Sequence, residues 1–304
     1  MGDGEVRAWL LESDPAIRYQ ALRDLYDAPA HEVAAERARI AGEGWGAELL
    51  SAQTADGYWG GDGPGDRWRF ALYTLHLLYQ LGIDPSAPEV VAAVEKTRDG
   101  VTWGAEFGDT GFFEGEVEPC INGRVLAIGA YFGQGNSGLR DRLVGEQLAD
   151  GGWNCDAPDS VRGSFHTTIC VLEGLREHAA RYGDTADNRE ARRRGEEYLL
   201  ERRMYRSLST GKVVDPAFTH FRFPDGSDYD VLRGLDYLRA AAHPDERAEE
   251  AVELVRSRRR DDGRWPYTDP GLSHQHVVME DDREPASRWI TLRALRVLRR
   301  AALT

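Results

Sequence analysis

Two short stretches in the middle of the chain carry the residue types best suited to chemistry. The first reads EPC at 118–120, and the second reads FHTTIC at 165–170. A carboxylate, a thiolate and an imidazole are ligands that zinc accepts, and three protein ligands leave a fourth position open, as in catalytic zinc sites. We therefore predict a zinc ion held by Glu118, Cys120 and His166, provided that the two stretches meet in space.

Two further cysteines are candidates for the fourth zinc ligand. Cys155 closely follows a tryptophan turn, and Cys170 lies four residues after His166, on the same face of a helix. Cys120 follows a proline that can open a helix, where the helix dipole favours a thiolate. The competing interpretation is that Cys120 packs as a small apolar residue and that His166 caps its helix.

A pair of acidic residues, Asp228 and Asp230, flanks Tyr229 at another predicted helix start. Either carboxylate could serve as a catalytic acid, a base or a metal ligand, because a carboxyl group with a raised pKa is a suitable proton donor. The simpler interpretation is that Asp228 caps the helix and Asp230 lies in its first turn.

Arginines and aromatic residues near the predicted helix starts could bind a substrate. The arginines, which would suit an anionic diphosphate, are Arg69, Arg124 and Arg233. The aromatic residues, which would suit a cationic or polyene substrate, are Trp68, Tyr73, Phe165, Tyr229 and Trp289.

Helices must position all of these residues, because helical periodicity dominates the sequence and strand-like alternation is nearly absent. Helices that are apolar on most of their surface alternate with charged, two-faced helices, and we expect the apolar ones to be buried. Their starts lie near Pro15, Trp68, Cys120, His166, Asp230 and Trp289. Six inner helices with outer partners predict an all-α fold, an (α/α)6 toroid of six helical hairpins.

We expect this toroid to be a single domain over residues 1–304, with a short N-terminal helix at 5–12. One long helix is predicted from about 31 to 53. A glycine–tryptophan turn then recurs as QTADGYW at 53–59, QLADGGW at 147–153 and RRDDGRW at 259–265, with a degenerate copy at 99–103. Glycine takes the left-handed conformation that ends a helix, and glutamine can bond the free carbonyls or the indole N–H.

Alternating helices with Q-x3-G-x-W turns resemble the terpenoid cyclase and protein prenyltransferase superfamily, including the squalene cyclase-like QW-repeat proteins. The resemblance implies an apolar central cavity, isoprenoid-like substrates and chemistry near the starts of the inner helices. In protein prenyltransferases an Asp-x-Cys and a His-Thr bind zinc, and this chain has Glu118-x-Cys120 and His166-Thr167. Proton-initiated cyclases carry an Asp-x-Asp-Asp motif, which is incomplete here because Val231 holds its fourth position.

The composition argues against several classes of function. The 304 residues carry a net charge of −14, which argues against a nucleic-acid-binding surface. The sequence contains no apolar run of about 18 residues that would predict a membrane span. Three cysteines without a secretory signal indicate a cytoplasmic protein without a disulfide framework.

Three functional hypotheses from different classes remain open. The first is a terpenoid cyclase- or prenyltransferase-like enzyme that uses zinc on an isoprenoid-like or other apolar small molecule in a central cavity. The second is a metal-free cyclase initiated by Asp228 or Asp230, and the third is a non-catalytic toroid that binds an apolar ligand or a protein partner. A glycosidase that pairs Glu116 or Glu118 with one of these aspartates is disfavoured by the turns. The sequence does not predict an oligomeric state.

Overall fold

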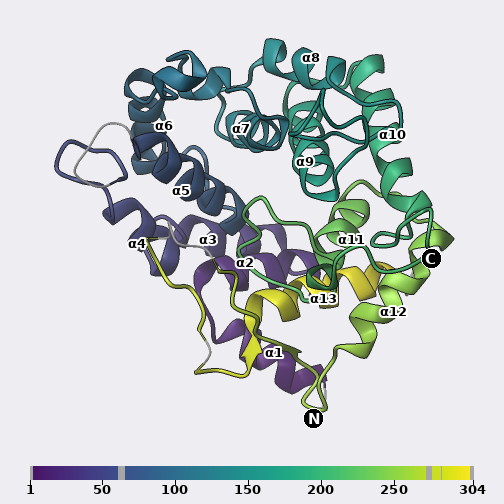
Figure 1. The fold of residues 1–304 in the computed structure, drawn as a ribbon. Coiled ribbons are helices and arrows are strands. Elements are labelled where there is room, and N and C mark those ends of the chain that lie inside the picture. Colours follow the sequence, from purple (N-terminus) through teal and green to yellow (C-terminus); the bar gives the residue numbers. More distant parts are fainter. Residues whose placement is uncertain (1–2, 61–65, 272–275, 282, 302–304) are drawn as a thin grey trace.

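The structure of the protein is a computed structural model that describes residues 3–60, 66–271, 276–281 and 283–301. Six inner helices surround the centre of the molecule (Figure 1). They are α2 (Pro15–Asp24), α5 (Arg67–Leu81), α7 (Pro119–Tyr131), α9 (Phe165–Tyr182), α11 (Val231–Ala240) and α13 (Arg288–Ala301). All six predicted starts are therefore confirmed to within one residue.

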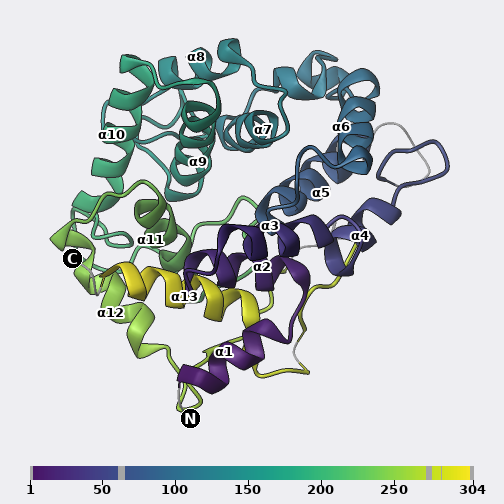
Figure 2. The same ribbon diagram turned by 180° about the vertical axis from the view of Figure 1, so that it is seen from behind.

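An outer layer of helices covers the inner ones, as the view from behind also shows (Figure 2). The outer helices are α1 (Asp3–Leu11), α4 (Gly44–Ser51), α6 (Pro88–Gly100), α8 (Ser137–Gly145), α10 (Ala186–Glu201) and α12 (Glu249–Ser257), while α3 (Ala30–Arg39) packs against α2. Two short strands, β1 (Trp265–Pro266) and β2 (Ala286–Ser287), pair antiparallel. The chain therefore forms an all-α toroid with inner and outer helices.

Polar contacts close the ring where helices distant in the sequence meet. The side-chain amide of Gln20 on α2 donates to the carbonyl of Gln80 on α5 (2.8 Å). The Arg296 guanidinium on α13 donates to Oε1 of Gln20 (3.0 Å) and lies 3.3 Å from the Asp24 carboxylate. Helix α2 is thereby linked to both the second and the last inner helix.

The three glycine–tryptophan turns share one geometry. Their glycines have left-handed φ angles, namely +81° at Gly57, +86° at Gly151 and +79° at Gly263. Each indole N–H donates to a carbonyl ten residues earlier, in the preceding outer helix: Trp59 to Leu49, Trp153 to Leu143 and Trp265 to Val255. The side chains of Gln53, Gln147 and Arg259 each donate to the carbonyl of the turn glycine. The turns therefore fasten the ends of α4, α8 and α12.

The degenerate turn predicted at 99–103 does not form. Gly100 remains the last residue of α6. The indole of Trp103 donates forward in the chain, to the carbonyl of Phe112 (3.0 Å), and not back to a helix end.

The single helix predicted from 31 to 53 is also wrong, because the chain breaks between α3 and α4. The Asp14 carboxylate, which caps α2, also accepts a hydrogen bond from the backbone N–H of Trp45 (2.8 Å). This bond fixes a second helix start, and Gly44 takes a left-handed φ of +62° to reach it. A Cβ atom at Gly44 would lie 1.9 Å from the Asp14 carboxylate.

A loop segment at 221–228, here called the mouth segment, enters the centre of the ring from the end where α11 and α13 start. Phe223 stacks on Trp289, the second residue of α13, with ring centroids 4.2 Å apart. Asp225 is buried and accepts hydrogen bonds from Gln80 (2.9 Å) and Arg293 (2.5 Å). The mouth segment thus brings a carboxylate into the ring.

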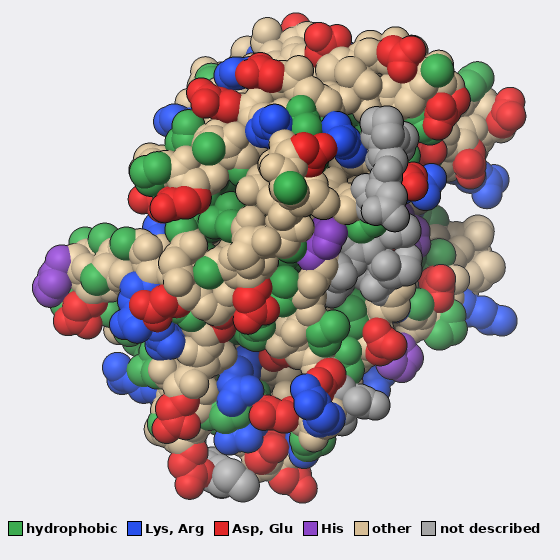
Figure 3. All heavy atoms as spheres, turned by 90° about the vertical axis from the view of Figure 1, so that its left-hand side faces the viewer, with side chains coloured by type: hydrophobic (Ala, Val, Ile, Leu, Met, Phe, Trp, Pro, Cys, Tyr) green, Lys and Arg blue, Asp and Glu red, His purple; other side chains and the backbone are tan. Residues whose placement is uncertain are grey.

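The outer surface is mixed in charge, since acidic and basic side chains are interspersed over the face in Figure 3. No helix within the described residues is both long and apolar enough to cross a membrane.

Candidate functional site

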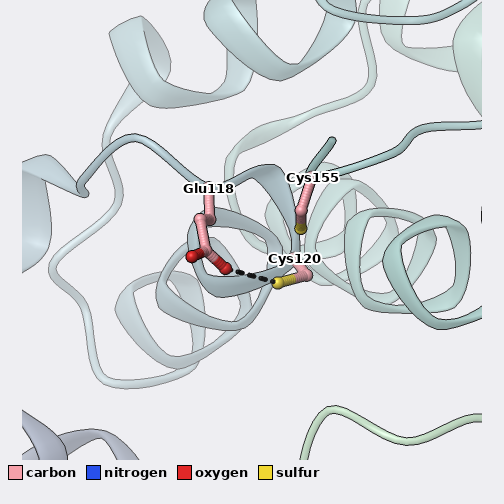
Figure 4. A group of neighbouring side chains, drawn as sticks. All are labelled: Glu118, Cys120 and Cys155. Carbon is pink, nitrogen blue, oxygen red and sulfur yellow. Dashed lines mark hydrogen bonds between the residues drawn. The ribbon is translucent and has the colours of Figure 1, made fainter. Parts of the chain in front are cut away.

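The start of α7 and the loop after Trp153 bring two thiols and a carboxylate together (Figure 4). Glu118 precedes Pro119, the first residue of α7, and Cys120 is the second. The Cys120 thiol donates to Oε2 of Glu118 (3.5 Å). The ligand atoms of Glu118, Cys120 and Cys155 all lie within 4.8 Å of one another. We refer to these three residues as the thiol cluster.

The glycine–tryptophan turn positions Cys155. The backbone N–H of Trp153 donates to Oγ1 of Thr168 (3.0 Å), which holds the turn against the first turn of α9. The Asn154 amide donates to the carbonyl of Arg162 (2.8 Å) and closes the loop that follows. Sγ of Cys155 then lies 3.4 Å from Oγ1 of Thr167. The glycine–tryptophan turn at 147–153 therefore places the Cys155 side chain next to the start of α7.

The pKa values of the two thiols in the cluster shift in opposite directions. The side-chain interaction with Cys120 lowers the pKa of Cys155, against the opposing effect of burial. The same interaction, together with burial, raises the pKa of Cys120. Cys155 is therefore the first thiolate of the pair, and a thiolate is the form that binds metal ions.

His166 lies apart from the thiol cluster, although the sequence predicted it as a ligand. Its Nδ1 accepts a hydrogen bond from the backbone N–H of Tyr229 (2.9 Å) and lies 3.7 Å from Oδ1 of Asp228. Because Nδ1 accepts, the neutral ring carries its proton on Nε2, which then has no lone pair for a metal. Burial lowers the pKa of His166 and favours this neutral form. The structure thus brings Cys155, and not His166, to Glu118 and Cys120.

Cys170, the other candidate ligand, is buried elsewhere. Its Sγ is 3.6 Å from Nη2 of Arg233 and 3.7 Å from the carbonyl of Ser227. Burial raises the pKa of the Cys170 thiol. It therefore remains a protonated packing residue outside the thiol cluster.

Of the two candidate acids, Asp230 is the one that caps α11. Its Oδ1 accepts from the backbone N–H of Arg233 (2.9 Å), and its Oδ2 accepts from that of Arg222 (3.1 Å). Complete burial, reinforced by the charge of Asp225, raises the pKa of Asp230 to about 6. Asp228 is 41 % exposed in its side chain and pairs with Arg222 (3.2 Å). Of these two aspartates, Asp230 is therefore the buried one with a raised pKa.

A cavity of about 510 Å³ lies at the centre of the ring and is lined by residues of all six inner helices. Its basic residues are Arg23, Arg37, Arg176, Arg233, Arg239, Arg293 and Arg296. Its acidic residues are Asp24, Glu173, Glu177, Asp225 and Asp236. The cavity wall is thus strongly charged, in contrast with the apolar cavity that the resemblance implied.

The charged wall arises because polar residues recur every three or four positions on otherwise apolar inner helices and so face the centre. Arg293 and Arg296 on α13 are an example, and both contact Asp236 of α11. Burial alone would raise the pKa of Asp236, but Arg296, Arg239 and Arg293 hold this pKa well below its usual range. Burial lowers the pKa of His76, as do the nearby charges of Arg124 and Arg233, so this histidine is neutral. His76, Asp236, Arg293 and Arg296 were not singled out from the sequence, although the spacing of polar residues on the inner helices was the available signal.

The predicted substrate-binding residues are divided between the cavity and the core. Arg233 and Trp289 line the cavity. Arg124 is buried one turn after Cys120, above the ring of Tyr73 (5.1 Å). The remaining residues lie elsewhere: Phe165 and Tyr229 pack on each other (5.0 Å), Trp68 packs on Trp103 (5.1 Å), and Arg69 is exposed over Trp68.

Comparison with known proteins gives structural matches only. No protein-family model and no curated protein matches the chain. Among solved structures, apo type II terpene cyclase MstE from Scytonema matches with a TM-score of 0.46 and 18% identity, over 96% of this chain and 88% of that one. A tyrosine-to-phenylalanine variant of MstE, also apo, matches with a TM-score of 0.45 and 19% identity, over 96% and 87%.

Proposed function

We propose that this protein is a zinc-dependent enzyme of the terpenoid cyclase and prenyltransferase type, with Glu118, Cys120 and Cys155 as the ligands of the ion. The supporting observation is that the ligand atoms of all three lie within 4.8 Å of one another. A tetrahedral zinc ion, bonded at about 2.3 Å to sulfur and about 2.1 Å to oxygen, separates such atoms by about 3.6 Å. The distance from Cys120 Sγ to Glu118 Oε2 is 3.5 Å.

Zinc at this position would supply Lewis-acid chemistry at an open fourth site, where it polarises a substrate or activates a nucleophile. The residues of the chain would orient that substrate. His166, with its proton on Nε2, would donate a hydrogen bond to it from the adjacent helix start. Arg124 follows Cys120 on the same face of α7, about 6 Å further along the helix.

Elemental analysis of the purified protein tests the metal site. We expect about one zinc per chain in the wild type, and loss of zinc in Cys120→Ala and Cys155→Ala. Cys170→Ala is the matched control, because it removes a thiol outside the cluster and should keep its zinc. Substitution with cobalt adds a second readout, because thiolate ligation gives charge-transfer absorption that each cluster variant should weaken.

His166→Ala tests whether the third zinc ligand is Cys155, as the structure indicates, or His166, as the sequence predicted. The hydrogen bond from Tyr229 to Nδ1 predicts that this variant retains zinc. Loss of zinc in His166→Ala with retention in Cys155→Ala would overturn the proposed ligands. A wild-type protein that contains no zinc and does not bind it on addition would refute the metal site altogether.

A metal-free, acid-initiated reaction is the second candidate, and the raised pKa of buried Asp230 favours it. Both oxygens of this carboxylate accept backbone N–H groups, however, which stabilises its ionised form. Activity that persists in chelator and is lost in Asp230→Asn would select this mechanism over the zinc-dependent one.

A further inference from the structure

The thiol cluster brings together two of the three cysteines of the chain, and all three are free thiols in this structure. Cys120 stands in the first turn of α7, and Cys155 lies in the loop after the second glycine–tryptophan turn. Their sulfur atoms lie within 4.8 Å of each other, although the whole of α8 separates the two residues in the sequence. In Figure 4 the sulfur of Cys155 points toward Cys120. The fold therefore makes these two thiols neighbours.

The two sulfur atoms are close enough to be bonded after a small movement. A disulfide bond requires them to approach to about 2.05 Å, so the gap to be closed is less than about 3 Å. Rotation of one cysteine side chain between staggered rotamers moves its sulfur by about this distance. The loop that carries Cys155 can also follow, because residues 156–159 and 161–162 are exposed. A bond between Cys120 and Cys155 therefore needs no rearrangement of the inner helices.

The three cysteines differ in their access to solvent. Cys120 and Cys155 are half-buried, so a small oxidant can reach them, whereas Cys170 is fully buried. The Cys170 thiol is enclosed between the carbonyl of Ser227 (3.7 Å) and the guanidinium of Arg233 (3.6 Å). The fold thus pairs two accessible thiols and sets the third aside, which makes Cys170 an internal reference for the reactivity of the pair.

We propose that Cys120 and Cys155 are an oxidation site, where hydrogen peroxide converts the two thiols into a reversible disulfide bond. One thiol attacks the peroxide: an S–O bond forms, the O–O bond breaks, and a sulfenic acid and one water result. The second thiol attacks the sulfur of that sulfenic acid: the S–S bond forms, the S–O bond breaks, and the hydroxyl group leaves with the thiol proton as a second water. The two sulfurs together lose two electrons, which reduce one peroxide to two waters.

The disulfide bond would switch off metal binding at the thiol cluster. Zinc binds the thiolate form of cysteine, so one S–S bond removes two of the three proposed ligands and leaves only Glu118. Oxidation should therefore release the ion, and reduction by a dithiol should restore the site. This consequence rests on the proposed zinc site, whereas the disulfide bond itself rests only on the positions of the two thiols.

Peptide mapping of the metal-free protein tests the disulfide bond. Trypsin cleaves after lysine and arginine, which places the three cysteines on separate peptides, namely 99–124, 143–162 and 163–176. After treatment with hydrogen peroxide and alkylation of the remaining thiols, we expect peptides 99–124 and 143–162 to be joined, at about 2 Da below the sum of their masses. Peptide 163–176, with Cys170, should carry the alkyl group. Dithiothreitol should separate the joined pair.

Protein unfolded in urea is the matched control. Cys155 and Cys170 are the closest pair in the sequence, so loop closure favours their bond in the unfolded chain. The native protein should instead join Cys120 to Cys155, and Cys170→Ala should keep this cross-link. The same mixture of pairs in native and unfolded protein, or oxidation of the native thiols without a cross-link, would overturn the proposal.

Zinc release separates this proposal from the proposed function. In zinc-loaded protein we expect one zinc ion to be released for each disulfide bond formed, as a chromogenic chelator measures, and to bind again after reduction. A cross-link in protein that never binds zinc would refute the zinc site but leave the oxidation site. Zinc binding without any cross-link would refute the oxidation site but leave the zinc site. Zinc that stays on the cross-linked protein would overturn the proposed switch.

Discussion

Gly174→Ala should separate α7, which carries Cys120, from α9, against which the loop with Cys155 is held. Gly174 on α9 faces Gly123 on α7, and a Cβ atom at Gly174 would lie 2.2 Å from the carbonyl oxygen of Gly123. In the opposite direction, a Cβ atom at Gly123 would lie 2.4 Å from the carbonyl oxygen of Cys170. The obstacle is backbone on both sides, so no side chain can rotate out of the way.

The geometry sets the size of the effect. A carbon and a carbonyl oxygen approach to about 3.3 Å at the closest in ordinary contacts, so the helices must move apart by roughly 1 Å. Overpacking of this kind costs about 1–3 kcal/mol, and rigid backbone on both sides places the cost at the upper end. The higher helix propensity of alanine compared with glycine offsets about 1 kcal/mol of this cost. We therefore expect Gly174→Ala to lower the free energy of unfolding by about 2 kcal/mol.

Urea unfolding measures this change, and Gly145→Ala is the matched control. Gly145 ends α8, and nothing lies within 4 Å of a Cβ atom placed there. That substitution should stabilise the protein by up to about 1 kcal/mol through helix propensity alone. If Gly174→Ala proves as stable as Gly145→Ala, the close contact between α7 and α9 is not real and the reasoning fails.

The same variant should weaken metal binding. Cys120 moves with α7, whereas Cys155 is tied to α9 through the bond from Trp153 to Thr168. A shift of about 1 Å between the helices exceeds the tolerance of about 0.5 Å for a preorganised site. Competition with a chelator should therefore show lower zinc affinity in Gly174→Ala and unchanged affinity in Gly145→Ala.

Two further predictions concern pH. Because the pKa of Cys155 is lowered, this thiol should be the first to be alkylated in zinc-free protein, and the pH midpoint of its alkylation should lie below that of free cysteine. Cys170 should stay unmodified, and added zinc should protect Cys155. Mass spectrometry reads the order of modification, and earlier modification of Cys170 would contradict the prediction. The pKa of Asp230 is raised from 3.8 to about 6, so its stabilising contribution is complete below pH 4 and is lost as the pH rises through 6. The loss amounts to about 3 kcal/mol on the scale of 1.36 kcal/mol per pKa unit, and urea unfolding across this range should show it in the wild type but not in Asp230→Asn.

The helix starts could be predicted because their signals are local. Pro15 and Pro119 each stand at the first position of an inner helix, and the side chain of Asp14 caps the first of these. The break between α3 and α4 could not be predicted, because it depends on a bond from Trp45 to Asp14, 31 residues away. A periodic sequence gives no sign of such a distant cap.

The thiol cluster was predicted only in part, because only part of it depends on residues that are close in the sequence. Glu118 and Cys120 are neighbours in one helix start, so their proximity follows from the sequence. The approach of Cys155 depends on the crossing of α7 and α9, and the orientation of His166 depends on a backbone N–H at Tyr229, 63 residues away. The polar residues of the cavity wall are visible in the sequence as polar positions on apolar helices, as in Arg293 and Arg296. That they face a common cavity follows only from the arrangement of the six inner helices around one centre.

The bond between Gln20 and Arg296 has a consequence for how the ring comes into being. It forms a seam between parts of the chain that are 276 residues apart, and contacts of such long range are slow to form. Helices α2 and α13 both contribute to the cavity wall. The cavity is therefore complete only when these two helices have packed together. A chain with an open seam would still assemble the thiol cluster between α7 and the loop held against α9, but it would lack the complete central cavity. Ligand binding in the cavity would therefore report closure of the whole ring, whereas metal binding would report only one neighbouring pair of helices.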